Sequence, residues 1–109
     1  MTCPGGKHGS GVYQQIINRI PPHEIYIEPF LGGGAIMTMK RPATKSIGMD
    51  IDLDVIKNFP GTAAPNLTLL QGNAIQWLAL QTFTPDCFIY LDPPYLMDTR
   101  SSARQIAAR

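Results

Sequence analysis

The residues of this sequence best suited to chemistry are Asp92-Pro93-Pro94-Tyr95, an acid followed by two prolines and an aromatic ring. Proline has no backbone N–H, so two prolines in a row restrict the chain to a corner and leave nearby carbonyl groups without a local donor. Such a corner can present the Asp92 carboxylate and a proline carbonyl as adjacent acceptors beside the tyrosine ring. These groups match a planar heterocycle with an exocyclic amine, because the amine donates twice and the ring stacks. The simpler interpretation is a proline turn closed by a packed tyrosine.

A second candidate is the stretch 25–35, IYIEPFLGGGA, in which an apolar strand pattern meets Pro29 and the three glycines at 32–34. Glycine lets the backbone adopt a positive φ and approach a ligand closely. A helix that begins after the glycines would direct its unpaired N–H groups into the space above the strand end, where open α/β sheets bind ligands. The pattern therefore indicates a nucleotide-like cofactor site. A glycine-rich hinge without a ligand is the alternative.

The rest of the sequence predicts the elements that position these two stretches. Helical spacing of apolar residues and β-branched runs alternate along the chain, separated by proline and glycine. Strands are predicted at 25–27, 46–49, 67–70 and 87–91, and helices at 12–20, 35–40, 53–59 and 74–81. Because strands alternate with helices, we expect an α/β fold with a parallel sheet and helices on both faces. The apolar strand at 87–91 is of the kind that has neighbours on both sides, which indicates a larger domain.

Polar residues stand at or just after the end of each predicted strand. Glu28, Asp50 and Asp92 end three of the strands, and Asn73 follows the remaining one. The carboxyl ends of parallel strands lie along one edge of a sheet, so these four positions are expected to converge on one crevice.

Asp50 has the spacing of an acid that binds a ribose. It follows Gly34 by sixteen residues, close to the separation found in dinucleotide folds. A carboxylate can accept two hydrogen bonds from a cis-diol. The alternative is a strand-end or helix-capping acid, although Asp52 and Asp54 are better placed to cap the following helix.

Composition and charge narrow the class of protein. At 109 residues, 44% hydrophobic and 16% charged, the chain is expected to form one globular domain. It has no apolar run of membrane-spanning length and no signal-peptide pattern, so we expect a cytoplasmic protein. Cys3 and Cys87 lack metal-type spacing, and Cys87 is expected to be a small buried hydrophobe. The net charge is +3 over 1–49, −5 over 50–98 and +3 over 99–109, which suits a polyanionic partner and a central cationic or hydroxyl-rich ligand.

Four motifs occur in a recognisable order: PGGK at 4–7, YIEPFLGGGA at 26–35, DID at 50–52 and DPPY at 92–95. In this combination the sequence resembles the Dam-like DNA adenine-N6 methyltransferases over most of residues 4–96. The resemblance implies a Rossmann-like methyltransferase fold with S-adenosylmethionine as the cofactor. About four of the usual seven strands are present, so residues 1–109 are expected to be the N-terminal part of a single catalytic domain.

The resemblance also implies roles for particular residues. Lys7 and Glu28 would lie at the methionine end of the cofactor, Asp50 would bind the ribose hydroxyls, and Asn73 would lie near the adenine. The full set implied for S-adenosylmethionine is Lys7, Glu28, Pro29, Phe30, Gly32, Gly34, Asp50 and Asn73.

For the target base, the resemblance implies the catalytic residues Asp92, Pro93, Pro94 and Tyr95. The Asp92 carboxylate and the Pro93 carbonyl would accept hydrogen bonds from the N6 amine of an adenine flipped out of double-stranded DNA, and Tyr95 would stack on that base. Accepting both amine protons would favour a nucleophilic, tetrahedral nitrogen. No metal and no membrane are implied, and we expect a monomer encoded by a bacterium or a phage.

Two features depart from the family pattern. Asn73 stands where aspartate is common in related adenine methylases. Only 39 residues separate Asp52 from Asp92, so the inserted target-recognition domain of Dam is absent from this interval. Sequence specificity for DNA is therefore not implied.

Three other interpretations remain open. A related amine methylase could act on RNA or on a protein glutamine, because the DPPY corner suits planar amines in general. A non-catalytic remnant could bind only cofactor or nucleic acid. A Rossmann dinucleotide-binding protein would explain Gly32, Gly34 and Asp50 but leaves DPPY without a role.

Overall fold

The computed structural model describes residues 10–93 of the chain. Among the predicted site residues, Lys7, Pro94 and Tyr95 lie outside this range. The elements in chain order are α2 (Ser10–Asn18), β1 (Ile25–Glu28), α3 (Ala35–Met39), β2 (Lys45–Asp50), α4 (Leu53–Asn58), β3 (Leu67–Gln71), α5 (Ala74–Leu80) and β4 (Cys87–Ile89). Each predicted helix and strand is confirmed, and its ends differ from the predicted ends by at most two residues.

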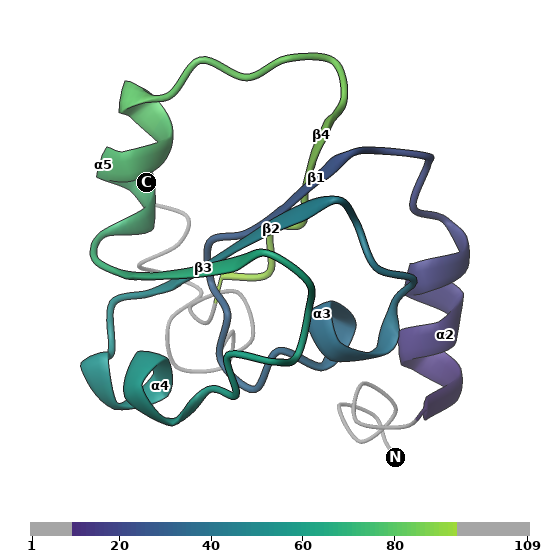
Figure 1. Ribbon diagram of the computed structural model, residues 1–109, viewed down its shortest axis with the longest axis horizontal. Helices are drawn as coiled ribbons and strands as arrows, with labels where there is room; N and C mark the ends of the chain where they lie inside the picture. The colour runs from purple at the N-terminus through teal and green to yellow at the C-terminus, as the bar shows by residue number, and fades with distance from the viewer. Residues whose placement is uncertain (1–9, 94–109) are drawn as a thin grey trace, which may run out of the picture.

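The four strands form one parallel sheet in the order β3-β2-β1-β4 (Figure 1). The chain adds β2 and then β3 on one side of β1, and afterwards returns past both strands to place β4 on the other side. The direction of strand addition therefore reverses between β1 and β4. Open α/β sheets bind ligands at such a reversal, outside the carboxyl ends of the strands. The α/β class and the parallel sheet are confirmed, whereas the Rossmann-like methyltransferase fold stays a prediction.

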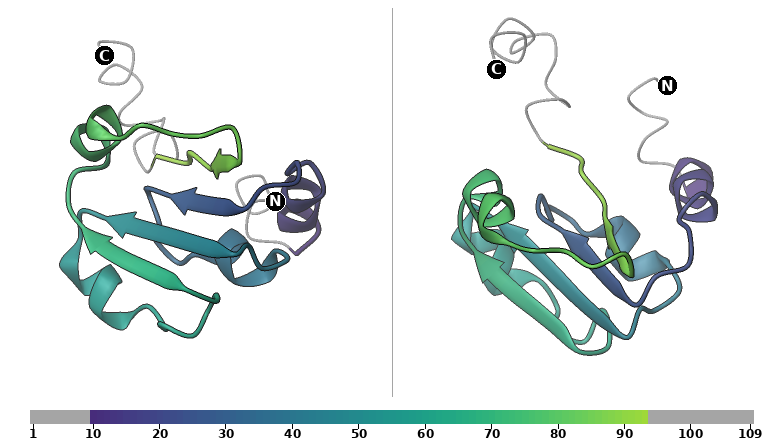
Figure 2. Two further views of the ribbon diagram at one scale, coloured as in Figure 1. Left: turned by 45° about the horizontal axis from the view of Figure 1, so that its top comes forward. Right: turned by 90° about the horizontal axis from the view of Figure 1, so that it is seen from above.

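Helices lie on both sides of this sheet (Figures 1 and 2). On one side, which we call the helix-covered face, side chains of α2, α3 and the end of α4 join the sheet in a single apolar cluster. α5 lies on the opposite side, as expected when crossovers of one hand run in opposite directions along the sheet. Within residues 10–93, no helix has both the length and the apolar character needed to cross a bilayer.

The helix-covered face is built around Tyr26, at the centre of β1. Its side chain has no exposed surface. Strand pairing places Phe88 of β4 on one side of it and Ser46 of β2 on the other. The Phe88 ring stacks on Tyr26 with 6.4 Å between the ring centroids. Ser46 is also buried, and its small side chain leaves room for the large residues that pack from the helices.

The opposite face of the sheet is covered less completely. Ile27 and Met49 are buried there, whereas Ile75 and Leu80 of α5 remain 59% and 82% exposed. Cys87 is only half-buried, so the prediction that it is a buried hydrophobe is wrong. The reason is its position in β4, which among the described strands is an outer one with a neighbouring strand on one side only.

β4 ends at Ile89, two residues before the predicted end of the strand. Its partner β1 ends at Glu28, and the next residue, Pro29, has no N–H with which to extend the ladder. The Tyr90 N–H still donates to the Ile27 carbonyl at 2.9 Å. The chain therefore leaves the sheet shortly before it reaches Asp92.

The glycine-rich loop after β1 packs against β2 through Leu31. The Leu31 side chain is buried above Gly48, where a Cβ would lie only 3.0 Å from it, and the Leu31 N–H donates to the Met49 carbonyl at 2.8 Å. Gly32 and Gly34 have φ values of 52° and 65°, in the left-handed region that other residues rarely adopt. The predicted need for glycine is confirmed at these two positions.

Replacing Gly34 by alanine is expected to lower the free energy of unfolding by roughly 2–4 kcal/mol, from backbone strain and overpacking together. A Cβ at this position would lie 2.2 Å from the Phe59 ring. Gly33→Ala is the matched control, because its φ is not positive and its Cβ would meet no atom within 4 Å. We expect a change below about 1 kcal/mol for the control. Denaturant unfolding of both variants tests this, and equal losses would contradict the loop conformation.

Candidate functional site

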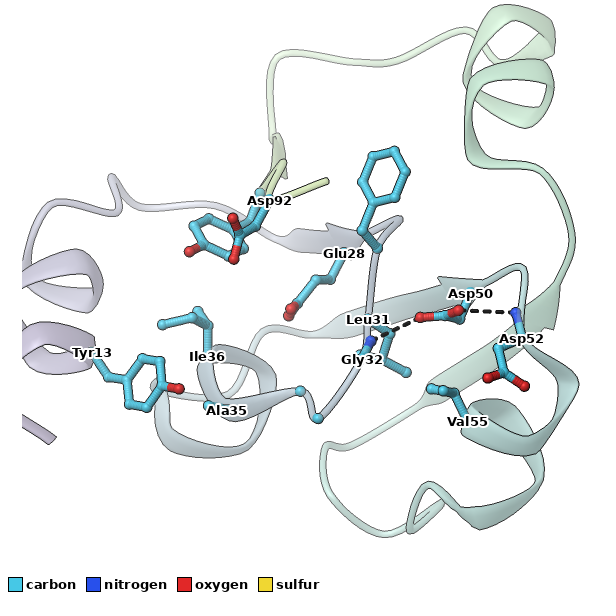
Figure 3. Close-up of a pocket in the computed structure, with 14 residues that line it drawn as sticks. Tyr13, Glu28, Leu31, Gly32, Ala35, Ile36, Asp50, Asp52, Val55 and Asp92 are labelled. Atoms are coloured by element: carbon cyan, nitrogen blue, oxygen red, sulfur yellow. Dashed lines mark hydrogen bonds between the residues drawn. The ribbon is translucent and has the colours of Figure 1, made fainter. Parts of the chain in front are cut away.

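A pocket of about 360 Å³ opens at the carboxyl ends of the strands, next to the reversal of strand order (Figure 3). Its volume lies within the range of small-ligand sites. Glu28 at the end of β1, Asp50 at the end of β2 and Asp92 after β4 all line it, together with the glycine loop. The convergence of these strand ends on one crevice was predicted from the sequence and is confirmed for these three acids.

The pocket has two ends that differ in chemistry (Figure 3). At what we call the Asp92 end lie Asp92 and Glu28, and Ile36 separates them from the phenol ring of Tyr13. At the Asp50 end, Asp50 and Asp52 lie near Val55 and the start of α4. The glycine loop runs between the two ends.

Asp50 fixes the glycine loop to the end of β2. One of its carboxylate oxygens accepts a hydrogen bond from the Gly32 N–H at 2.9 Å, and the other accepts one from the Asp52 N–H at 2.9 Å. A carboxylate oxygen has two lone pairs, so each oxygen keeps capacity to accept from a ligand hydroxyl. The helix-capping role belongs to Asp52, whose side chain accepts from the Asp54 N–H. The prediction that Asp52 is better placed than Asp50 to cap the following helix is therefore confirmed.

Glu28 is a buried acid in the pocket wall, with only 4% of its surface exposed. The Tyr26 hydroxyl donates to its carboxylate at 2.8 Å. The pKa of Glu28 is raised to about 7, chiefly by burial and in smaller part by the negative charge of Asp92, whereas hydrogen bonds from the Tyr26 hydroxyl and the Met37 N–H oppose the rise. Glu28 therefore titrates near neutral pH, where it can meet a cationic ligand group as a carboxylate.

The Asp92 end also carries two phenols. Tyr90 lies two residues before Asp92, and Tyr13 projects from the first turn of α2. Burial raises the pKa of Tyr90 to about 12, with further contributions from the negative charges of Asp92 and Glu28. Tyr90 therefore offers a neutral hydroxyl group at physiological pH, able to donate or accept.

The pocket wall is acidic. Glu28, Asp50, Asp52 and Asp92 line it, and among the described residues around it there is no lysine, arginine or histidine. Apolar contact surface comes from Phe30, Leu31, Ile36 and Val55. Such a wall attracts a cationic or hydroxyl-rich ligand with an apolar part and repels phosphate groups.

The structure brings together six of the predicted site residues. Glu28, Phe30, Gly32, Gly34, Asp50 and Asp92 all line this pocket. Pro29 and Pro93 are buried and are not among its lining residues. Asn73 is not in the wall either, because its side chain caps α5 by accepting from the Gln76 N–H at 3.0 Å. The predicted roles of Lys7, Pro94 and Tyr95 fall outside the described residues.

Several pocket residues did not emerge from the sequence as site residues. Tyr13 is an apolar position of the helix predicted at 12–20, and Tyr90 is part of the apolar strand predicted at 87–91. Their signal was a polar group on an otherwise apolar face, and for Tyr90 a spacing of two from Asp92, which places both toward the same side of an extended chain. Val55 and Ile36 carry no signal beyond ordinary core spacing.

A second hollow of about 650 Å³ lies away from this pocket and is lined by residues from α2, the turn before β1 and the end of α3. None of the predicted site residues between positions 10 and 93 lines it. Within residues 10–93, no group of three or more His, Cys, Asp or Glu side chains is arranged to hold a metal ion.

Comparison with known proteins did not identify relatives. No protein-family model matches the sequence, and neither the curated proteins nor the solved structures contain a match. The site must therefore be interpreted from its own chemistry.

Replacing Glu28 by glutamine is expected to stabilise the protein above neutral pH. The pKa of this carboxyl rises from 4.5 to about 7 on folding, so the folded chain binds the proton more tightly than the unfolded chain does. The free energy of unfolding therefore falls as pH rises between these values and stays lower above them. At pH 8 we expect Glu28→Gln to gain on the order of 2 kcal/mol, and at pH 4 close to nothing.

Denaturant unfolding at the two pH values measures this difference. Glu24→Gln is the matched control, because Glu24 is the other glutamate of the sequence and is exposed. A pH-independent effect of Glu28→Gln, or the same effect in the control, would contradict the buried and titrating carboxyl.

Proposed function

We propose that this chain carries the cofactor site and the target-amine corner of a Dam-like methyltransferase, which transfers a methyl group from S-adenosylmethionine to the N6 amine of adenine in DNA. The observation that carries the proposal is one acidic pocket shared by Glu28, Asp50 and Asp92 at the reversal of strand order. Three motifs that are far apart in the sequence supply these acids. A sequence resemblance resting on separate motifs is therefore supported by a common site.

The residues of the pocket fit S-adenosylmethionine better than they fit a phosphate-bearing nucleotide. This cofactor carries sulfonium and ammonium charges, a ribose diol and a planar base. Acids at both ends of the pocket suit the positive charges and the diol, and Phe30 and Val55 supply apolar surface for the base. When bound, the cofactor supplies an activated methyl group.

Each acid has a separate proposed role. Asp50 would accept hydrogen bonds from the ribose hydroxyls with the lone pairs that the loop N–H groups leave available. Glu28, in its ionised form, would face the ammonium group at the methionine end. These contacts orient the cofactor and require little rearrangement, because Asp50 is already held at both oxygens.

Asp92 is proposed to hold the target amine. It lies in the pocket wall directly before two prolines. The first of these, Pro93, is buried, and this burial restrains the backbone next to Asp92. The carboxylate would accept an N–H of the amine and so favour a nitrogen whose lone pair is released from the ring. The phenols of Tyr13 and Tyr90 bring hydroxyl groups to the same end of the pocket.

Isothermal titration of the 109-residue chain is expected to give the affinity order S-adenosylmethionine, then S-adenosylhomocysteine, then NAD. Loss of the sulfonium charge removes one attraction to the acidic wall, worth about tenfold in Kd, and the NAD phosphates are repelled. Asp50→Ala should weaken binding of S-adenosylmethionine by about tenfold or more.

Asp54→Ala is the matched control, because Asp54 follows the same strand but does not line the pocket. A thermal melt of each variant separates weaker binding from loss of folded protein. Tighter binding of NAD than of S-adenosylmethionine would favour a dinucleotide-binding protein and overturn the cofactor assignment.

Asp92→Ala is expected to abolish transfer of labelled methyl groups to double-stranded DNA and to leave the Kd of S-adenosylmethionine within a few-fold. The reason is that Asp92 would contact the target amine, whereas Glu28 and Asp50 hold the cofactor. Label recovered as N6-methyladenine checks the product. If the variant still transfers methyl groups to DNA, the proposed role of Asp92 in the reaction is wrong.

A second candidate is a non-catalytic module that binds the cofactor. The incompletely covered face beside α5 favours it, because a methyl-transferring site needs a firmly held β4 and this strand has only three residues in the ladder. Binding of S-adenosylmethionine without any transfer to DNA, to RNA or to a glutamine-containing peptide would select this candidate.

A further inference from the structure

Two buried side chains, Tyr26 and Lys40, lie behind the wall of the pocket. Tyr26 is fully buried, and its hydroxyl donates to the Glu28 carboxylate at 2.8 Å. Lys40 is only 7% exposed, and its ammonium lies 4.5 Å from the centroid of the Tyr26 ring. Neither residue lines the pocket. A buried ammonium is costly unless it is well partnered, so its position over this ring needs a reason.

α3 contacts Glu28 near its first turn and carries Lys40 at its last. In the first turn of α3, the Met37 N–H donates to the Glu28 carboxylate. At its other end, Lys40 caps the helix and donates from its Nζ to the Arg41 carbonyl at 2.7 Å. The same short helix therefore contacts the acid in the pocket wall and places a cation over the tyrosine that donates to that acid.

We propose that Tyr26 and Lys40 are positioning residues that hold the Glu28 carboxylate where it faces the ligand of the pocket. This inference rests on the proposed function for the identity of the ligand, but not for the arrangement itself. Lys40 acts through the Tyr26 ring and Tyr26 through its hydroxyl. Neither touches the ligand.

The electrostatics of the arrangement follow from the contacts. A cation over the face of a phenol draws electron density from the ring and makes the hydroxyl a stronger donor. A stronger donor to a carboxylate favours its ionised form, which opposes the effects of burial and of the nearby Asp92. Tyr90, which directly follows β4, and Tyr13 of α2 are the other titratable groups around this end of the pocket.

The sequence allows a direct measurement, because it contains only two glutamates, Glu24 and Glu28. Protein labelled with ¹³C at the glutamate carboxyl gives one signal from each, and the Glu28→Gln variant identifies the Glu28 signal. The exposed Glu24 serves as an internal reference in every spectrum. Titration without any ligand reports the midpoint of Glu28 in the wild-type chain and in the variants.

Tyr26→Phe keeps the ring under Lys40 and removes only the hydroxyl, so we expect the Glu28 midpoint to rise by about one pH unit. Lys40→Met should raise it in the same direction by a smaller amount. A purely structural role for the two residues would change the melting temperature but leave the midpoint in place. Unchanged midpoints in both variants would overturn the proposal, and Lys40→Met decides the question if Tyr26→Phe does not fold.

Binding of S-adenosylmethionine supplies a second readout. At pH 7 we expect Tyr26→Phe to weaken binding by about fivefold, because a rise of about one pH unit lowers the ionised fraction of Glu28 by about that factor, and we expect the deficit to shrink as pH rises and Glu28 ionises again. A deficit that does not change with pH would count against positioning of the carboxylate. If the wild-type chain binds no S-adenosylmethionine, the cofactor assignment fails, but the ligand-free titration still tests the roles of Tyr26 and Lys40.

Discussion

The carboxylate of Asp50 is the group on which the site depends, because it hydrogen-bonds both to the glycine loop after β1 and to the residue that caps α4. Through one oxygen it holds the Gly32 N–H, and through the other it holds the N–H that precedes α4. The Leu31 contact above Gly48 brings the loop close enough for these bonds to form. The walls of the pocket at the Asp50 end are therefore fixed before any ligand arrives, which lowers the entropy that binding must cost.

At the opposite end of the pocket, the main feature is the free-energy cost of burying the Glu28 carboxylate. Burying Glu28 beside Asp92 disfavours the charged form of this acid. Tyr26 and the first turn of α3 reduce this penalty without removing it. The chain thus keeps a destabilising acid in a core position, which is common where a residue serves a ligand rather than the fold.

Much of this arrangement could be predicted from the sequence. The alternation of apolar runs with proline and glycine gave the order and type of all the described elements, and the acids at strand ends gave the three carboxylates of the pocket. What could not be predicted depends on pairing between distant segments. Cys87 is half-buried because β4 lies at the edge of the sheet, a position that no local pattern predicts. Tyr13 enters the pocket only because α2 packs beside α3, and Lys40 meets Tyr26 for a similar tertiary reason.

The strand order has a consequence for how the two ends of the pocket respond to local unfolding. The Asp50 end is assembled from near neighbours in sequence, since β1, the glycine loop, α3 and β2 are consecutive along the chain. The Asp92 end depends on β4, in which Ile89 pairs with Ile27, 62 positions earlier, through a ladder of three residues. Short edge strands closed over long loops open at low free energy, whereas contiguous units stay formed. Detachment of β4 would therefore withdraw Asp92 and Tyr90 and leave the anchored glycine loop in place, so that the two ends of the pocket would be lost at different denaturant concentrations.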